Sequence, residues 1–275
     1  MTKAVFEDKL LVGVESDDEL ITVTQFLWIK VTRNDINILM PNPTNSSQKF
    51  VIDQMKKSTS NNFGYIVNSF HELEKVYVNS WNSEATPKVW YVEPLCIAEP
   101  ERKPQKKPFW IQWLDQKLAQ GKRESESLDE GFEERVKERG IVVKQWVDQS
   151  RILKHQCVEG FLSHCGWNSA LESICYGVSI LAWPKIAEQA LNARMVVEEI
   201  KLGLRVESTC NGMKPLFLKW EGLMKMVKEL MEGEMGKQAR KRVKQVAELG
   251  KMAMADADGS YWQTLDLLIN ELCNK

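Results

Sequence analysis

The sequence has almost no net charge, since 37 lysines and arginines stand against 38 aspartates and glutamates among its 275 residues. A balanced chain has no global field that attracts nucleic acid or an anionic membrane, so any site for a polyanion must be local. Cysteine is also sparse: there are six, and none forms a Cys-x-x-Cys pair. This spacing excludes a disulfide scaffold and favours buried thiols in a reducing compartment.

Long apolar runs are missing as well. No stretch approaches the roughly 18 apolar residues that a membrane helix needs, and the first twenty residues lack the basic start and apolar run of a signal peptide. We therefore expect a cytoplasmic protein without a membrane partner. The basic segment 237–244 (KQARKRVK) has no interleaved aromatic residues and is followed by acidic ones, so a solvated helix face is favoured over a nucleic-acid site.

The first third of the chain alternates between strand and helix patterns. Residues 20–29 are predicted to be extended or loop, 42–47 a turn and 48–58 a helix. Residues 63–68 (FGYIVN) predict a buried strand, the segment from Ser69 a helix with its own cap, and residues 88–92 another strand. This order favours a parallel sheet with helices on its faces.

A proline-rich and charged stretch, residues 99–108, is predicted to be a linker. An amphipathic helix is expected at 109–118, and residues 121–130 are again polar. Strands are then predicted at 140–145, 158–163, 178–183 and 204–206, and helices at 168–176, 188–200, 218–230, 236–254 and 261–273. The pattern is that of a doubly wound α/β domain.

Ten residues, 164–173 (HCGWNSALES), crowd polar groups where a predicted strand passes into a helix. In an open parallel sheet this is the ligand crevice, and a helix start offers unpaired N–H groups that suit an anion. His164 can donate to a phosphate, Asn168 and Ser169 can donate or cap the helix, and Gly166 allows close approach. Glu172, one turn on, suits a pair of sugar hydroxyls. The arrangement indicates a nucleotide diphosphate site.

A structural interpretation stands beside this one. Asn-Ser before a helix is commonly a cap, and His, Trp and Cys in such a turn are commonly core residues. Each residue taken alone favours a structural role, whereas the combination of these residues in one segment favours a ligand-binding site.

The segment from Trp146 to Gln189 resembles the signature box of plant secondary-product UDP-glycosyltransferases over its whole length. A tryptophan begins the box, a glutamine follows three residues later, HCGWNS lies in the middle, and an acidic-Gln pair ends it. Asp148 stands where the family usually has proline. The flanking segments agree, so the resemblance covers nearly the whole chain. It implies a GT-B-like α/β fold with two Rossmann-type doubly wound domains, both incomplete here.

The resemblance also implies roles for single residues. Trp146 stacks on uracil, Gln149 bonds the uracil and ribose end, and Glu172 takes the ribose hydroxyls. The diphosphate is held by His164, Asn168 and Ser169, and the sugar is faced by Trp167, Glu188 and Gln189. Because Gln189 stands where the family places glutamine for glucose, UDP-glucose is the implied donor, with no cofactor and no metal.

The family's general base, a histidine near the N-terminus supported by an aspartate, has no counterpart among His71, His155 and His164. We therefore assign no catalytic residue. The chain resembles a family member truncated at its N-terminus. It is also internally deleted, because residues 122–139 are too few and too polar for a βαβ unit of about 30 residues. Exposed sheet edges predict marginal stability or self-association.

The predicted organisation is an N-terminal acceptor-domain remnant (1–98), a linker (99–108), an incomplete UDP-sugar domain (109–255) and a C-terminal helix (256–275). The predicted function is inverting transfer of glucose from UDP-glucose to a hydroxyl of a small plant metabolite, such as a flavonoid or terpenoid. The alternative is a non-catalytic remnant or UDP-binding fragment.

Overall fold

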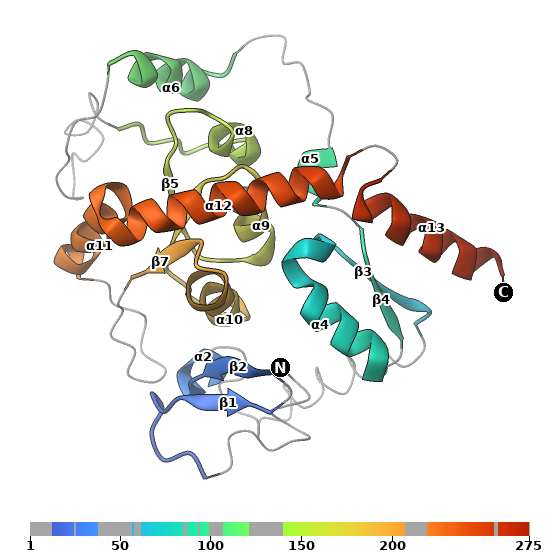
Figure 1. Cartoon of the computed structure of the whole chain (residues 1–275). Coiled ribbons are helices and arrows are strands. Elements are labelled where there is room, and N and C mark those ends of the chain that lie inside the picture. The colour runs from blue at the N-terminus through green and yellow to red at the C-terminus, as the bar shows by residue number, and fades with distance from the viewer. Residues whose placement is uncertain are drawn as a thin grey trace.

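A computed structural model describes residues 13–24, 26–37, 57, 62–84, 87–92, 94–98, 107–120, 140–206, 219–255 and 258–274. Strands and helices alternate along most of the chain, and Figure 1 shows them distributed around one long helix, α12. The N-terminal elements are β1 (Ile21–Val23), β2 (Phe26–Val31), α2 (Arg33–Asn37), β3 (Gly64–Val67), α4 (His71–Glu84), β4 (Lys88–Tyr91) and α5 (Leu95–Ala98).

The remaining elements form the larger part of the molecule. They are α6 (Phe109–Gln120), α8 (Gln149–Leu153), β5 (Gly160–Ser163), α9 (Trp167–Cys175), β6 (Ser179–Ala182), α10 (Gln189–Arg194), the π-helical turn η1 (Met195–Glu199), β7 (Gly203–Arg205), α11 (Trp220–Glu232), α12 (Glu234–Ala253) and α13 (Ser260–Cys273). No helix of the described ranges is long and apolar enough to cross a membrane.

Strands β5, β6 and β7 form a parallel sheet in that order, with β6 in the centre. Every residue of β6 is buried. Ile180 and Ala182 lie in a core with residues of α9, η1 and α12, whereas Leu181 lies in a second core with Leu204 and with Leu230 of α11. Because successive side chains of a strand point to opposite faces, helices cover both faces of this sheet. The doubly wound prediction is confirmed here.

A second parallel sheet consists of β3 and β4, with α4 as the crossover between them. The two strands and the helix were predicted within a few residues of their observed bounds. The expectation that the first strand is buried is wrong in part, because 65% of the Ile66 surface is exposed. Helix α13 packs on β4, and α12 reaches α4, so the end of the chain packs against the unit formed by β3, α4 and β4 (Figure 1).

The N-terminal hairpin docks on the larger sheet domain. Residues 20–29, predicted to be extended or loop, form most of the antiparallel pair β1–β2. Leu191 of α10 packs against the core of this hairpin. Asp35 of α2 is 3% exposed and accepts hydrogen bonds from the Thr32 amide (2.9 Å) and hydroxyl (2.8 Å). It also forms ion pairs with Arg194 and Arg205 (3.3 Å for the latter), which join α2 to α10 and β7.

The predicted strand at 140–145 is wrong, since residues 140–144 have no regular structure and Gln145 is a bend. Among the described residues β5 pairs only with β6, so the apolar Ile-Val-Val run has no strand beside it to complete its backbone hydrogen bonds. Four predicted segments lie outside the described residues. They are the turn at 42–47, the helix at 48–58 apart from Lys57, the linker apart from residues 107–108, and the polar stretch 121–130. The domain boundaries stay a prediction.

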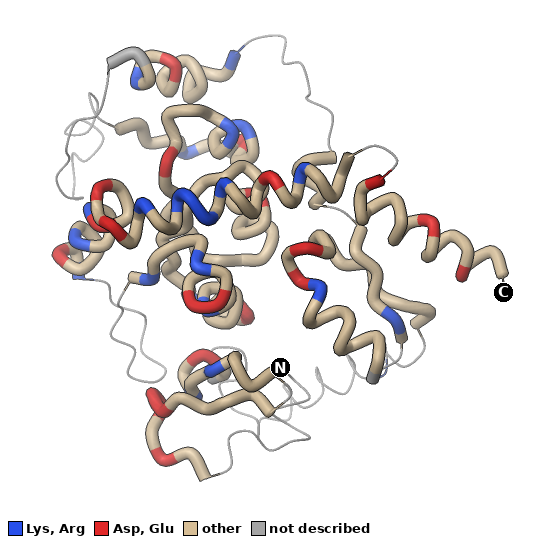
Figure 2. The backbone as a smooth tube through the Cα atoms, viewed as in Figure 1, with Lys and Arg blue, Asp and Glu red and all other residues tan. Residues whose placement is uncertain are grey.

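Segment 237–244 of α12 carries five basic side chains and no acidic one, and the two acidic residues of the helix, Glu234 and Glu248, lie on either side of it (Figure 2). Lys237 pairs with Glu234 at 3.8 Å, and Lys251 pairs with Glu248 at 2.8 Å. Such exposed pairs are typical of a solvated helix face. The arrangement supports the interpretation of segment 237–244 as a surface of α12, and the expected absence of a nucleic-acid partner stays a prediction.

Candidate functional site

The candidate site lies where β5 and β6 end side by side. The Trp183 amide, just after β6, donates to the carbonyl of Ser163, the last residue of β5, at 2.8 Å. Cys165 follows with a φ of 64°, a left-handed conformation that is uncommon outside glycine. Its amide donates to the Ser163 hydroxyl (3.0 Å), and its carbonyl accepts from the Asn192 side chain (3.0 Å). These bonds hold the tight turn that leads into α9.

Cys165 is completely buried, and burial raises the pKa of its thiol to about 11. A thiol with this pKa is neutral near pH 7 and is a poor nucleophile. Cys165 is therefore a structural residue of the turn. The expectation of buried thiols holds for Cys165 and Cys175, whereas it is wrong for Cys273, which is exposed near the end of α13.

Helix α9 begins without a side-chain cap. Its N-cap is Gly166, so the prediction that Asn168 or Ser169 caps this helix is wrong: both residues lie inside its first turn. An uncapped helix start presents N–H groups and a partial positive charge. A Cβ placed on Gly166 would lie 2.5 Å from Nε2 of His164, so the exposed imidazole lies beside this helix start. The sequence prediction that His164 and the start of the helix form one polar site agrees with this geometry.

Gln149 connects α8 to the side of α9. Its side-chain amide donates to Glu172 Oε2 at 2.7 Å and to Ser169 Oγ at 3.2 Å. Asp148, at the usual proline position, caps α8 by accepting from the Arg151 amide at 3.1 Å. The structure therefore brings together three predicted site residues, Gln149, Ser169 and Glu172, although the first and the last are more than twenty positions apart in the sequence.

Trp146 precedes this cluster and is 81% exposed, the largest exposed fraction among the described large hydrophobic residues. An indole left in water costs hydrophobic free energy unless a partner covers it. Its ring is available to stack on a planar ligand.

Trp167 and Asn168 contact the N-terminal part of the chain. The Trp167 indole N–H donates to the carbonyl of Asn68 at 2.9 Å, and the Asn68 amide donates to Asn168 Oδ1 at 3.2 Å. Asn68 Oδ1 accepts in turn from the Leu95 amide at 3.0 Å. Asn68 follows β3 and ties the two sheets together at the site. The sequence analysis missed it, although a polar residue directly after a parallel strand was the available signal.

Gln189 is 9% exposed, and its carbonyl oxygen accepts from the amides of Lys185 (3.0 Å) and Ile186 (3.1 Å). It therefore shapes the loop between β6 and α10, in which Ala187 has a φ of 54°. Because the side-chain oxygen of Gln189 is engaged in these bonds, its side-chain N–H groups are the ones that can donate to a ligand. Glu188 is exposed at the start of α10.

The other two histidines have structural partners. His155 lies 3.2 Å from Asp115 of α6 and 3.1 Å from the Cys157 sulfur, and His71 contacts the edge of Tyr91. Burial raises the pKa of Cys157, so this pair is not an activated thiol. The described residues contain no group of three or more His, Cys, Asp or Glu that could hold a metal ion.

Comparison with known proteins bears on the fold and the family of the chain. The model of the family described as UDP-glucoronosyl and UDP-glucosyl transferase matches residues 129–246. A solved Glycyrrhiza uralensis structure, UGT73P12 complexed with glycyrrhetinic acid 3-O-monoglucuronide, superposes with a TM-score of 0.82 at 26% identity, over 97% of this chain and 65% of that one. A Siraitia grosvenorii transferase in complex with UDP gives 0.77 at 25% identity, over 99% and 74%. The fold is therefore GT-B.

Among curated proteins, UDP-glycosyltransferase 90A1 of Arabidopsis thaliana is 42% identical over 98% of this chain and 65% of its own length. UDP-glycosyltransferase 90A2 of the same plant is 38% identical over 98% and 66%. The chain belongs to the plant UDP-glycosyltransferase family.

The chain spans about two thirds of the length of these relatives. The alignment with 90A1 runs over 313 positions, 38 more than the 275 residues of the chain. At least that many positions of the relative have no counterpart here, so the chain lacks internal segments that this relative has.

Proposed function

We propose that the chain binds a UDP-sugar at the start of α9 and acts in glycosyl transfer from it. One observation carries the proposal: the start of α9 has no side-chain cap and lies beside the His164 imidazole, and the same helix carries Ser169 and Glu172, which accept from Gln149 of α8. The first feature suits a diphosphate, and the second suits ribose hydroxyls.

The proposed binding mode follows the order of these features along the site. Trp146 stacks on uracil, which is worth about 1–3 kcal/mol per base, and Gln149 and Glu172 bond the ribose end. His164, Asn168 and Ser169 hold the diphosphate. Trp167, Glu188 and Gln189 lie on the sugar side, where the amide of Gln189 selects glucose. Glu172 can keep its bond to Gln149, because a carboxylate has a second oxygen for a ribose hydroxyl.

We also propose the reaction. The oxygen of an acceptor hydroxyl attacks the anomeric carbon, the bond from that carbon to the UDP oxygen breaks, and the hydroxyl proton passes to a base. The start of α9 stabilises the negative charge that develops on UDP. No residue of this chain is assigned as the base. A Phytolacca americana relative solved with UDP-2-fluoro-glucose and pterostilbene supports the kinds of donor and acceptor, and a small plant phenol such as a flavonoid is the proposed acceptor.

Two further proposals concern the setting. Cytoplasmic location is supported by the five described cysteines, which are all free. Self-association through an exposed sheet edge is supported by Ile66 on β3, a strand that has β4 as its only partner in the described structure.

Isothermal titration of the folded chain with UDP and UDP-glucose tests the function. Saturable binding of both is expected. Binding without turnover on any acceptor would favour the non-catalytic UDP-binding fragment, and failure of a well-folded chain to bind either compound would refute the donor site.

Gln189→Glu tests the sugar assignment. The glutamate keeps an oxygen for the Lys185 and Ile186 amides but loses the N–H donors, so the loop should survive while contacts to the sugar are lost. We expect the affinity for UDP-glucose to fall about fivefold more than that for UDP. Gln189→Ala serves as the comparison, since it should also lower the melting temperature. Equal losses for both ligands in Gln189→Glu would place Gln189 away from the sugar.

A further inference from the structure

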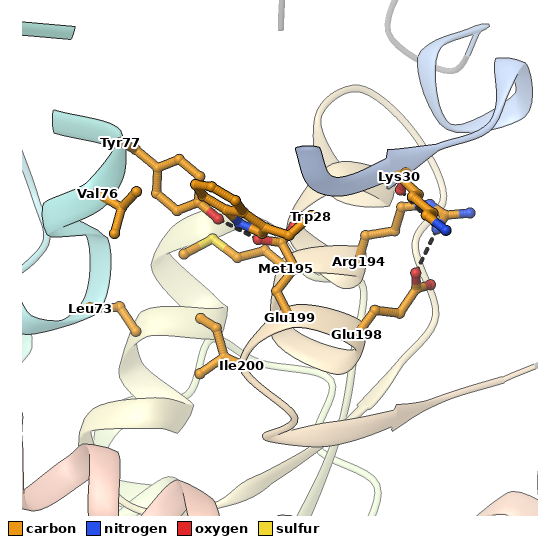
Figure 3. A pocket seen from close by; sticks show the side chains of 10 residues that line it. All are labelled: Trp28, Lys30, Leu73, Val76, Tyr77, Arg194, Met195, Glu198, Glu199 and Ile200. Carbon is orange, nitrogen blue, oxygen red and sulfur yellow. Dashed lines mark hydrogen bonds and ion pairs between the residues drawn. The ribbon is translucent and has the colours of Figure 1, made fainter. Parts of the chain in front are cut away.

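A cavity of about 450 Å³ lies apart from the donor site, within the size range of small-molecule sites. Three segments that are distant in sequence enclose it: β2, α4 and the end of α10 with η1. Its lining residues are Trp28, Lys30, Leu73, Val76, Tyr77, Arg194, Met195, Glu198, Glu199 and Ile200 (Figure 3).

The cavity lies at the opposite end of α10 from the proposed donor site. Gln189 begins α10 next to the carboxyl end of β6, whereas Arg194 ends this helix and η1 continues it toward the start of β7. The Leu202 amide, just before β7, donates to the Val196 carbonyl at 2.8 Å. A ligand here would therefore contact neither the start of α9 nor the Gln149–Glu172 pair.

The floor of the cavity has unusual backbone geometry. Residues Met195–Glu199 form a π-helical turn, closed by the Ile200 amide donating to the Met195 carbonyl at 2.9 Å. Lys201 follows with a φ of 62°. π-turns are rare and occur often at functional sites, and strained residues persist where a function keeps them. This turn brings the adjacent Glu198 and Glu199 to one cavity (Figure 3).

The charges around the cavity balance. Arg194 pairs with Asp35 and, at 2.6 Å, with Glu198, while Arg205 also pairs with Asp35. Of the residues that line the cavity, Lys30 and Arg194 carry positive charges, and Glu198 and Glu199 carry negative ones. A neutral ligand is therefore favoured over an ion, because an ion would lose its hydration without a net opposite charge.

The hydrogen-bonding groups favour a hydroxyl. The Tyr77 hydroxyl donates to Glu199, and burial together with this bond raises the Tyr77 pKa, so the phenol remains a neutral donor. Each carboxylate keeps lone pairs that can accept from a ligand hydroxyl, and the ammonium of Lys30 can donate to it.

The remaining wall is apolar and partly open to water. Trp28 is 57% exposed and Val76 46% exposed, although both line a concave site. Such exposed apolar surface in a concavity marks a ligand-binding site, and a flat indole wall suits a planar ring. We propose that this cavity binds a neutral, planar aromatic molecule carrying a hydroxyl group, independently of the donor site.

The probe is 2-naphthol, which is neutral near pH 7, and the comparison compound is naphthalene-2-sulfonate, which has the same rings and a negative charge. Titration of the full chain should give one saturable 2-naphthol site and at least tenfold weaker binding of the sulfonate. Saturating UDP should not displace 2-naphthol. No saturable binding up to about 1 mM 2-naphthol, or displacement by UDP, would overturn the proposal.

Val76→Trp places a large ring in the cavity from a position that is already half exposed, so the fold should tolerate it. We expect at least tenfold weaker 2-naphthol binding. Val227→Trp is the matched control, because Val227 is 41% exposed on α11 and does not line the cavity. Unchanged binding in Val76→Trp, or an equal loss in the control, would contradict the assignment.

Discussion

Replacing Asp35 with alanine is expected to lower the free energy of unfolding by about 3–5 kcal/mol. The side chain is buried and pairs with Arg194, whose own side chain is 11% exposed, and with Arg205. Without the carboxylate, the largely buried Arg194 guanidinium keeps Glu198 as its one counter-charge among the described residues, and the Thr32 amide and hydroxyl lose their acceptor. Urea denaturation of both proteins at pH 7 measures the difference.

A matched control is Asp17→Ala, since Asp17 forms an exposed pair with Arg33 at 3.6 Å. Such surface pairs contribute about 0–1 kcal/mol. An Asp35→Ala chain that loses no more stability than Asp17→Ala would contradict the assigned importance of the buried network.

The effect of Asp35 should depend on pH in a defined direction. Burial raises the pKa of its carboxyl, but the hydrogen bonds from Thr32 and the charge of Arg194 outweigh burial, so the folded-state pKa lies below its usual value. A lowered folded pKa means that the stabilisation is complete above the unfolded-state pKa of about 3.9 and is lost as the pH falls through the folded value. The stability gap between wild type and Asp35→Ala should therefore be constant from pH 6 to 8 and narrow below about pH 4.

His164→Ala and Glu172→Ala are each expected to weaken UDP binding about tenfold or more. Each removes one charge-assisted hydrogen bond of roughly 1.5–3 kcal/mol, to the diphosphate for His164 and to the ribose for Glu172. His164 is exposed, so its loss should leave the melting temperature nearly unchanged. Loss of Glu172 also removes the nearer of the two acceptors of Gln149, so a small decrease in melting temperature is expected for that variant.

Glu221→Ala is the control for these two variants, since it removes an exposed carboxylate at the start of α11. Its UDP affinity should match that of the wild type. If both site variants also bind UDP with wild-type affinity, the donor site does not lie at the start of α9.

The elements and the outline of the site were predictable from the sequence because both depend on local patterns. Short apolar runs bounded by turn residues identified β3, β4, β5 and β6, and the apolar spacing of the later segments identified α11, α12 and α13. The same reasoning failed at residues 140–145. That run has the composition of a strand, but a strand forms only where a neighbour supplies hydrogen bonds, and no local pattern records whether one is present.

The sequence by itself determined the family, the doubly wound arrangement around β6, and the box from Trp146 to Gln189, because consecutive residues carry these features. Only the tertiary structure decided that Gln149 bonds Glu172, that Asn68 contacts Trp167 and Asn168, and that Gln189 is committed to its own loop. It alone brought Trp28, Tyr77 and Glu199 to one cavity and Asp35 to Arg194. These contacts join side chains far apart in sequence, and their free energy depends on burial and distance, which exist only once the chain has folded.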